Sequence, residues 1–530
     1  MDDFDLSWSS FRDCLASRLD DAATFLVELR GEVRDRRSWT VGEWRRDVER
    51  TAACLRDQGI ERGSVVAALA GNTADALLLA YGCWLLGACY VPLNASDRVE
   101  RHSYVVSHSS ASLLVHSPEM ELQARGIERS DSVALLDTAR LSLLREAALG
   151  PDPSPVPAAE LGLAALRIYT SGTTGAPKGV VLTTRNLLTD CDGLARALGW
   201  PAETRMMTVL PIHHVNGLLI GSLLPWVNGH STVLRDRFRA SSFWDDARLE
   251  GATVSSVVPT LLEFLLGTEP PPGPALREVL CGAGPLLSET AITFEDTFGI
   301  PVRHLYGLSE TTAVVTLMPS LSVEERRRWH RDHPTPSIGP AIPHVEVDVH
   351  DAAGESVADG VTGELVVRGA VVMREYADMG METEQALRGG WFRSGDQGCR
   401  VRACSGEPYF FITGRLKEVI VRGGVNISPV EIDAVLRRHK AVRFALAVPF
   451  ENRFYGEEIA AYVSLASPVS DAEIHEHCAK HLEFGRRPKV IIRGDEVPFT
   501  STGKPQRLEL AQRLAEELLP YREVQFRPAS

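Results

Sequence analysis

The segment 169–180 reads YTSGTTGAPKGV and gathers hydroxyl residues and glycines around one lysine, Lys178. Glycines let backbone amides approach an anion, hydroxyls donate to its oxygens, and the lysine adds positive charge. The spacing differs from the GxxxxGK[ST] of a Walker A loop. Because apolar runs flank the segment on both sides, a flexible linker explains it poorly. The pattern predicts a phosphate-binding loop whose contacts come from Thr170, Ser171, Gly172, Thr173, Thr174, Gly175 and Lys178.

Lysine is rare in this chain, with six lysines against fifty arginines. Lysine carries a compact ammonium on a flexible side chain, whereas arginine carries a planar guanidinium. The few lysines therefore mark places where arginine substitutes poorly. Besides Lys178, Lys504 stands in the polar turn Thr-Ser-Thr-Gly-Lys, and Lys417 lies in the segment 414–429. We interpret the other three as surface charges: Lys440, Lys480 and Lys489.

Composition narrows the class of protein. The chain has 530 residues, 44% hydrophobic and 24% charged, as in an ordinary globular protein of about three or four structural units. A net charge of -14 argues against nucleic acid as a partner, because phosphate backbones need a basic face. Nine cysteines without paired spacing, and an acidic start with no signal-peptide core, favour the cytoplasm.

Apolar runs alternate with helix-like stretches in the first half of the chain, which predicts parallel α/β layering. The expected strands are 65–69, 113–116 and 253–258, and the expected helices are 74–86 and 261–266. The uncharged stretch 76–93 is near the lower length limit of a membrane helix. Its glycines, its proline and its strand-like end at 88–91 favour a buried helix running into a buried strand, with no membrane span. The proline-rich stretch 150–158 is an expected surface connection.

The pattern changes in the second half of the chain. Alternation at 345–349 and the strand 363–369 predict a β-rich subdomain, and the charged stretch 322–333 is expected to be a solvated helix or loop. An α+β pattern then follows: strands 417–421, 441–449 and 459–463, and helices 429–438 and 470–481. The predicted fold class is therefore α/β, with a large N-terminal α/β domain at 1–413, its β-rich part at about 335–413, and a small α+β C-terminal domain at 414–530.

The phosphate loop and further motifs in the same order resemble the ANL superfamily of adenylate-forming enzymes, which includes acyl-CoA synthetases, peptide-synthetase adenylation domains and luciferases. The resemblance covers nearly the whole chain. Its motifs are LPIHHVNGL at 210–218, GAGPL at 282–286, YGLSETT at 306–312, WFRSGDQG at 391–398, GRLKEVIVRGGVNISP at 414–429 and PFTSTGKPQR at 498–507. One such motif can arise by chance, but seven in order hardly can.

This resemblance implies activation of a carboxylic acid by ATP to an acyl-adenylate. Two anions must meet, so catalysis is mainly positioning and charge neutralisation. The resemblance makes Glu310 the Mg²⁺ ligand, in keeping with the preference of magnesium for carboxylates. It makes Lys504 a catalytic lysine on a mobile C-terminal lid with its hinge near Lys417. The other implied nucleotide contacts and catalytic residues are Thr174, His214, Gly282, Ala283, Gly284, Tyr306, Gly307, Thr311, Asp396 and Arg415.

Several implied roles have plain alternatives. Asp396 is expected to accept the ribose hydroxyls. Tyr306 is expected to lie beside adenine, although a core tyrosine has the same sequence signature. Arg415 is expected to reach the ribose or the phosphates from the hinge.

The second half-reaction implied by the resemblance is capture of the acyl group by a thiol. Gly423 and Gly424 are expected where a pantetheine arm passes close to the backbone. A plain hairpin turn would need the same glycines. The motif RGGVNISP resembles that of CoA ligases, which favours coenzyme A over a carrier-protein phosphopantetheine as acceptor. Lys489 is a further candidate for binding the phosphates of the thiol donor.

The acid pocket is expected to involve His213, His214, Asn216, Gly217, Gly282 and Leu308. The Asp that family members use to bind an amino acid's ammonium is absent, which disfavours an α-amino acid. His213 stands at a commonly aromatic position, and a polar wall there suits a small or hydroxylated acid or a dicarboxylate. We leave the identity of the acid open.

The favoured function is ATP-dependent acid–CoA ligation. The alternatives are a freestanding adenylation enzyme that loads a carrier protein, an adenylating enzyme with an unusual acid or acceptor, and a catalytically inactive nucleotide-binding regulator. The presence of Lys504, Glu310 and Asp396 speaks against the last alternative.

Overall fold

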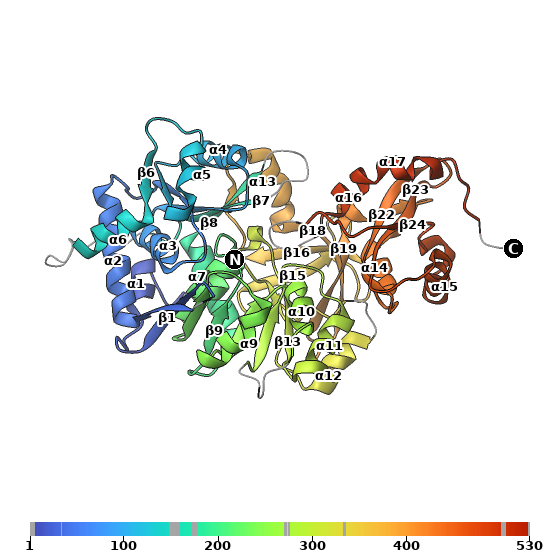
Figure 1. The fold of residues 1–530 in the computed structure, drawn as a ribbon, viewed down its shortest axis with the longest axis horizontal. Helices are drawn as coiled ribbons and strands as arrows, with labels where there is room; N and C mark the ends of the chain where they lie inside the picture. The colour runs from blue at the N-terminus through green and yellow to red at the C-terminus, as the bar shows by residue number, and fades with distance from the viewer. Residues whose placement is uncertain are drawn as a thin grey trace.

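The computed structural model describes residues 6–32, 34–147, 160–170, 177–269, 273, 276–331, 335–499 and 505–527. The expected connection 150–158, the loop residues 171–176 and Lys504 lie outside the described residues. In Figure 1 a large body carries the blue to yellow part of the chain, and a smaller orange and red body lies beside it next to β18 and β19. The chain therefore has the large and the small part that its sequence predicted.

An eight-stranded sheet forms one half of the large body. Its order is β14-β13-β12-β11-β9-β10-β1-β2, with parallel pairing except at the two edge strands. The strands are β1 (Thr24–Arg30), β2 (Asp35–Thr40), β9 (Arg205–Thr208), β10 (Ser231–Arg235), β11 (Val254–Val257), β12 (Glu278–Cys281), β13 (Val302–Tyr306) and β14 (Thr316–Leu317). Because β9 to β13 run in parallel, their carboxyl ends meet at one edge of the sheet.

A seven-stranded sheet forms the other half, in the order β17-β8-β7-β4-β3-β5-β6. Its strands are β3 (Val65–Leu69), β4 (Cys89–Leu93), β5 (Leu113–His116), β6 (Ala134–Asp137), β7 (Ala164–Thr170), β8 (Lys178–Thr183) and β17 (Glu375–Tyr376). Strands β7 and β8 are antiparallel and flank the predicted phosphate loop. The described residues on both sides of 171–176 thus belong to neighbouring strands of one sheet.

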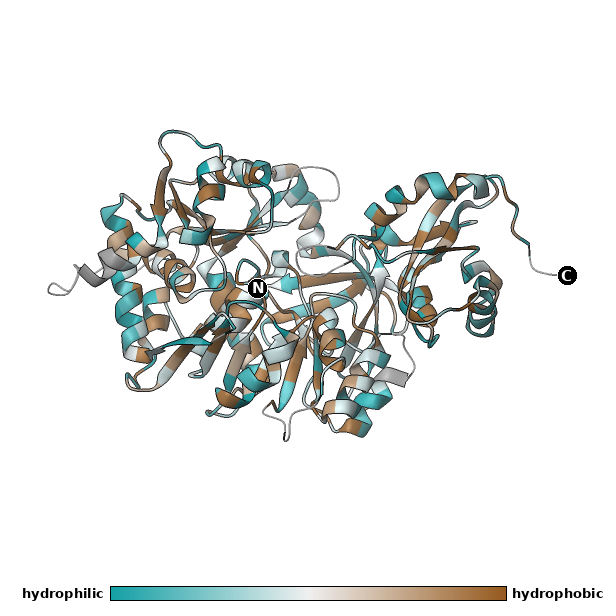
Figure 2. Cartoon of the chain, in the orientation of Figure 1, coloured by the Kyte–Doolittle hydropathy of each residue, from teal (hydrophilic) through white to brown (hydrophobic). Residues whose placement is uncertain are grey.

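Helices cover both sheets. Those of the large body are α1 (Phe11–Ala16), α2 (Val41–Asp57), α3 (Ala74–Leu86), α4 (Val99–His108), α5 (Glu121–Gly126), α6 (Thr138–Ala147), α7 (Thr184–Leu198), α8 (Leu224–Val227), α9 (Ala240–Leu249), α10 (Pro259–Leu266), α11 (Ser288–Phe298), α12 (Val323–Arg331) and α13 (Gly380–Ala386). Figure 2 shows mostly hydrophobic strands inside and many hydrophilic helix faces outside.

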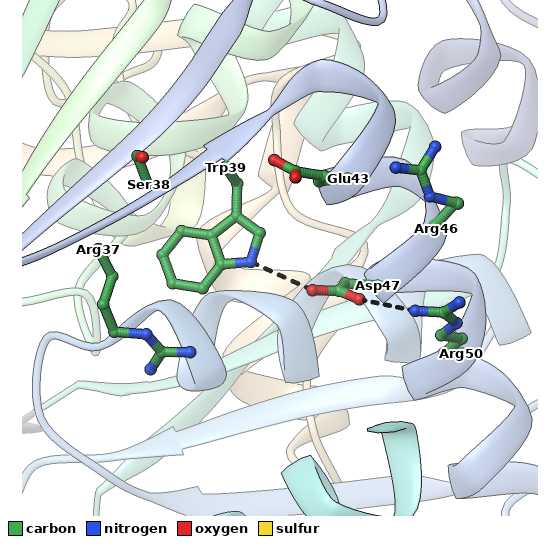
Figure 3. A pocket seen from close by; sticks show the side chains of 7 residues that line it. All are labelled: Arg37, Ser38, Trp39, Glu43, Arg46, Asp47 and Arg50. Carbon is green, nitrogen blue, oxygen red and sulfur yellow. Dashed lines mark hydrogen bonds and ion pairs between the residues drawn. The ribbon is translucent and has the colours of Figure 1, made fainter. Parts of the chain in front are cut away.

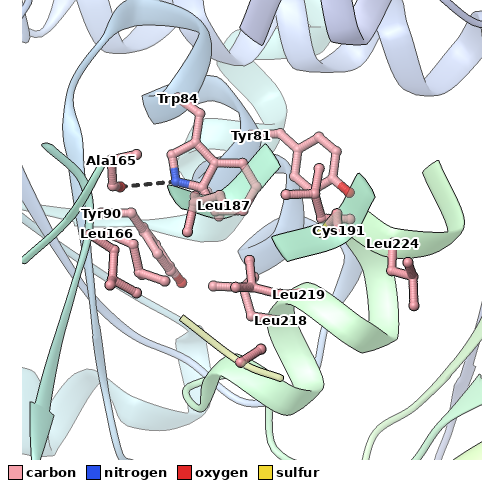
Figure 4. Packing of buried hydrophobic residues seen from close by; sticks show 14 of the residues in the cluster. Tyr81, Trp84, Tyr90, Ala165, Leu166, Leu187, Cys191, Leu218, Leu219 and Leu224 are labelled. Atoms are coloured by element: carbon pink, nitrogen blue, oxygen red, sulfur yellow. Dashed lines mark hydrogen bonds between the residues drawn. The ribbon is translucent and has the colours of Figure 1, made fainter. Parts of the chain in front are cut away.

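Helix α3 is the apolar stretch that resembled a membrane helix. The Thr73 side chain caps it at Ala76 N, and Gly87, at φ 76°, ends it. Nearly all of its residues are buried, and Trp84 donates its indole N–H to the Ala165 carbonyl at 2.9 Å, within the core drawn in Figure 4. Its long apolar run is therefore explained by burial between the two sheets. Among the described residues no helix is long and apolar enough to cross a bilayer.

A four-stranded antiparallel sheet follows, as the alternating valines predicted. Its order is β15 (Val345–His350), β16 (Gly363–Gly369), β18 (Phe392–Arg402) and β19 (Pro408–Arg415). The small body has a five-stranded sheet made of β20 (Ile420–Arg422), β21 (Val425–Ile427), β22 (Val442–Asn452), β23 (Gly456–Leu465) and β24 (Val490–Arg493). Its helices are α14 (Pro429–Arg437), α15 (Asp471–His481), α16 (Arg507–Arg513) and α17 (Ala515–Leu518).

Two local predictions need correction. The expected strand 417–421 begins only at Ile420, because the chain first makes a 3₁₀ turn, η5 (Leu416–Glu418), where it leaves one sheet for the next. The charged stretch 322–333 forms α12, but it is not fully solvated. The Arg326 guanidinium is buried and donates to Glu295 of α11 at 2.8 Å, which anchors the helix.

Candidate active site

The carboxyl edge of the eight-stranded sheet collects the motifs that the sequence singled out. His213 and Asn216 follow β9, Gly282 follows β12, and Tyr306 ends β13. The Asn216 side chain accepts a hydrogen bond from Ser256 Oγ at the end of β11, at 2.8 Å. Motifs separated by up to about a hundred residues are thereby brought to one place, as expected for open parallel sheets.

The acid-pocket motif turns from β9 into a π-helix, η2 (Asn216–Leu223). Gly217 is required there, because a Cβ at this position would collide with the Pro211 carbonyl. The rings of His213 and His214 lie 4.3 Å apart between centroids. Among the described residues, His213 Nε2 is buried without a hydrogen-bond partner, and burial lowers the pKa of its imidazole to about 4. The pocket motif therefore presents a neutral histidine with an unused polar atom.

Tyr306, Asp396 and Arg415 come together from three strands. The Tyr306 hydroxyl donates to Asp396 Oδ2 at 2.8 Å, and Arg415 Nε lies 3.1 Å from Asp396 Oδ1. Tyr306 is 6% exposed, and burial together with Asp396 raises its pKa well above the ordinary value. The burial of the ring fits the alternative of a core tyrosine, and its hydroxyl orients the carboxylate that is predicted to accept the ribose hydroxyls. The predicted contacts of all three residues with a nucleotide stay predictions.

Glu310 lies on a short 3₁₀ turn, η3 (Ser309–Thr311), directly after β13. Gly307 is required before it, because a Cβ there would collide with the Ala313 carbonyl. The Thr311 hydroxyl is buried and bonded to the Leu308 backbone, so in this structure it faces its own turn. Asp190 of α7 accepts the Val314 amide at 3.0 Å and so fixes the far end of the loop; burial raises the pKa of this carboxyl to about 8.

One residue near Glu310 was missed by the sequence analysis. The Tyr376 hydroxyl donates to Glu310 Oε1 at 3.0 Å, and Lys178 Nζ lies 4.7 Å from the centroid of the Tyr376 ring. No motif pointed to Tyr376, because its partners are 66 and 198 positions away. Only the pairing of β17 with β8 could have revealed it.

Gly423 and Gly424 form the two-residue turn between β20 and β21, with φ of 58° and 83°. Two positive φ values suit a tight hairpin, and glycine adopts them without strain. A Cβ on Gly424 would meet no atom of the described residues within 4 Å, so the turn geometry explains this glycine. The thiol-tunnel role of the pair stays a prediction. Lys417 lies on η5 between the two sheets, where partial burial and the nearby Arg415 lower its pKa.

Lys489 is not a surface charge, unlike Lys440 and Lys480, which are exposed. Its side chain is 5% exposed and donates to the carbonyls of Phe484 and Arg487 at 2.7 and 2.6 Å. Burial lowers the pKa of its ammonium to about 8. The sequence could not show this, because the carbonyls that receive it are exposed by a local 3₁₀ turn.

A polar hollow of about 610 Å³ lies over β2 and α2, far from these motifs along the sheet (Figure 3). The Arg37 guanidinium covers the Trp39 ring at 4.8 Å, and the indole donates to Asp47, which also pairs with Arg50. The hollow is lined by side chains that largely satisfy one another.

Comparison with known proteins agrees with this arrangement. Residues 16–377 match the AMP-binding enzyme family, and residues 431–504 match the AMP-binding enzyme C-terminal domain. The sulfoacetate–CoA ligase of Cupriavidus necator is 36% identical over 463 residues, covering 85% of this chain and 88% of that protein. The oxalate–CoA ligase of Arabidopsis thaliana is 31% identical and covers 89% and 92%. The o-succinylbenzoate CoA synthetase of Bacillus subtilis, solved with an acyl-adenylate intermediate, has a TM-score of 0.82 at 26% identity and covers 95% and 98%.

The chain belongs to the AMP-binding enzyme family, as the ANL resemblance predicted. It is an AMP-forming acid–CoA ligase, which activates a carboxylic acid with ATP and forms the CoA thioester. The predicted ATP, Mg²⁺ and coenzyme A are confirmed for this class, and the carrier-protein and inactive-regulator alternatives are not favoured. The residues fit magnesium, because Glu310 Oε2 accepts no hydrogen bond from the described residues.

Proposed function

We propose that this ligase activates a short carboxylic acid that carries a second oxyanion, such as a sulfonate or a second carboxylate. The observation that carries the proposal is the buried Nε2 of His213 in the acid-pocket motif, which has no hydrogen-bond partner in the described part of the chain. A buried polar atom without a partner is unfavourable, and a substrate oxyanion that accepts its N–H would relieve that. The neutral imidazole that burial enforces can donate this bond.

The names of relatives support the same class of acid. Sulfoacetate and oxalate, for which two relatives are named, are both short acids with a second acidic group. A histidine replaces a commonly aromatic residue at position 213, and an aromatic wall would suit an apolar acid instead. The histidine at position 213 is therefore a departure from the common family pattern, and this departure favours a polar acid.

The residue roles belong to the same proposal. Glu310 would hold Mg²⁺, which neutralises phosphate charge, while Asp396 would accept the ribose hydroxyls. Lys178 would bind phosphate from the large domain, and Lys504 would reach the site from a C-terminal domain that turns about Lys417. The break between β19, which ends at Arg415, and β20, which begins at Ile420, supports a hinge in this interval. We place the enzyme in the cytoplasm, supported by nine free cysteines.

The test is acid-dependent pyrophosphate release with CoA present. Sulfoacetate, oxalate, malonate and succinate are compared with monocarboxylic acids of matched length. The wild type should prefer acids with a second oxyanion by about tenfold or more in kcat/KM, an order of magnitude expected when a buried polar group is left unpaired. His213→Phe should shift the preference toward the monocarboxylic acids, whereas His213→Gln, which keeps a donor, should retain it.

Two outcomes would contradict the proposal. A wild type that prefers apolar acids would remove the assigned acid class. An unchanged preference in His213→Phe would show that His213 does not face the substrate.

A further inference from the structure

The segment 371–377 contacts both the loop of Glu310, the predicted magnesium ligand, and the strand of Lys178, the predicted phosphate-binding lysine. On one side it binds the Glu310 loop: Met373 N donates to the Glu310 carbonyl at 2.8 Å, and Thr312 Oγ1 donates to the Val371 carbonyl at 2.6 Å. On the other side it pairs with β8, the strand that begins at Lys178, with Tyr376 opposite Val180. The segment therefore holds the metal loop and the phosphate strand at a fixed distance.

Tyr376 is the side chain that spans this distance. Its hydroxyl donates to Glu310 Oε1 at 3.0 Å, and its ring lies 4.7 Å from Lys178 Nζ. The residue is 8% exposed, so its ring cannot turn away into solvent. Its backbone is fixed as well, since Tyr376 N donates to Thr383 Oγ1 at 3.0 Å and Ala377 N to the Gly179 carbonyl at 2.8 Å.

We propose that Tyr376 is a positioning residue that aims the Glu310 carboxylate at the metal through its hydroxyl and seats the Lys178 ammonium through its ring. The inference rests on the proposed roles of Glu310 and Lys178. With Oε1 held by the hydroxyl, Oε2 is the oxygen left for magnesium. The ring face attracts an ammonium, which limits the positions of a flexible lysine.

The hydroxyl and the ring of Tyr376 contact different groups, so the two parts of the side chain can be tested separately by substitution.

Tyr376→Phe removes the hydroxyl and keeps the ring. Tyr376 also lines a hollow of about 290 Å³ with Arg167 and Asp378. A smaller side chain would enlarge that space, whereas phenylalanine keeps the ring and removes only the hydroxyl. We expect the Mg²⁺ concentration for half-maximal ATP–pyrophosphate exchange to rise about tenfold, because hydrogen bonds to charged groups are the strong ones. The half-saturating ATP concentration should change much less. In Tyr376→Leu the ATP value should rise about a further threefold, because the ring under Lys178 is lost.

A matched control is Tyr409→Phe. Tyr409 is also buried, at 6% exposed, and its ring stacks on Trp329 away from Glu310. It should leave the Mg²⁺ titration unchanged, and the melting temperature of each variant shows that it folds.

The decisive comparison uses Glu310→Asp, which keeps the charge but shortens the side chain away from Tyr376. In this background Tyr376→Phe should change the Mg²⁺ half-saturation by less than about twofold, since coupled residues are not additive. The proposal is overturned if Tyr376→Phe titrates like wild type, or if it has the same effect in the Glu310→Asp background as it has alone. Either result leaves the ligase function standing, whereas a wild type that releases no pyrophosphate with any acid refutes that function itself.

Discussion

A tyrosine ring, a cation and a glutamate meet in each of the two bodies of the molecule. In the large one, Lys178 lies over Tyr376, whose hydroxyl donates to Glu310. In the small one, the Arg422 guanidinium lies 3.9 Å from the Tyr455 ring centroid and donates Nε to both oxygens of Glu458, at 2.8 and 2.9 Å. The same three kinds of group thus occur in two settings.

The two groups differ in how many hydrogen-bond partners the glutamate carboxylate already has. Glu458 is fully buried, its two oxygens accept from Arg422, and Lys489 Nζ lies 3.8 Å away with its own protons given to two carbonyls. Glu310 is only half-buried, and its carboxylate holds a single hydrogen bond among the described residues. We call the group around Glu458 the closed set, because both oxygens of its carboxylate accept from Arg422, which joins β20 to β23 next to the Gly423–Gly424 turn. We call the group around Glu310 the open set, because its carboxylate can exchange its partner for a metal.

The largest effect expected from this contrast concerns catalysis at the open set. Glu310→Gln removes the negative charge that would hold the metal, and turnover at saturating substrates should fall by about a hundredfold or more. The melting temperature should stay near that of wild type, because the carboxylate is not enclosed. The measurement is acid-dependent pyrophosphate release over a Mg²⁺ series, and a wild-type Mg²⁺ response would move the metal away from Glu310.

The next effect concerns stability at the closed set. Glu458→Gln leaves Arg422 and Lys489 buried without a counter-charge, which should lower the unfolding free energy of the small body by about 3–5 kcal/mol. Urea unfolding measures this loss. The control is Glu476→Gln, whose partner Lys480 is exposed, and its loss should stay below about 1 kcal/mol. Equal losses in the two variants would show that the closed set is not special.

The sequence predicted the bounds of local helices and strands better than it predicted contacts between distant side chains. The run 74–86 lies between a capping Thr73 and Gly87, and the strands 65–69, 113–116 and 363–369 are short and mostly apolar runs. Their predicted bounds agree with the structure. Such signals are local, and for that reason they can be read from one sequence.

Local signals could not predict the contacts of Tyr376 or the burial of Lys489. The importance of Tyr376 depends on its register with Val180, which the order of residues around it does not contain. The burial of Lys489 depends on the Phe484 and Arg487 carbonyls, which a local turn presents, and on Glu458, which the pairing of β23 with β24 brings near. Long-range strand register decides the first case and contributes to the second, and no motif of this chain encodes it.

A pH series sharpens the contrast further. Burial lowers the pKa of Lys489 in the folded chain to about 8 from 10.5. Between these values the unfolded chain binds more protons, so this lysine adds stability as the pH rises from about 8 to 10.5, by at most about 1.4 kcal/mol per pH unit. The advantage of wild type over Lys489→Met in urea unfolding should therefore grow over this range. A constant advantage of wild type over Lys489→Met across this range would show that the Lys489 ammonium is not desolvated.

The smallest effect is expected where a carboxylate and an arginine meet between the two bodies. Arg437 of α14 lies 2.8 Å from Glu263 of α10, with side chains 22% and 40% exposed. Water competes for both groups, so Arg437→Ala should lower the unfolding free energy by less than about 1 kcal/mol and leave adenylation within about twofold of wild type. Urea unfolding and pyrophosphate release measure the two. A contact this weak would be lost at little cost if the small body turned as proposed. A loss above about 2 kcal/mol would instead make it a fixed clamp and would argue against rotation about Lys417.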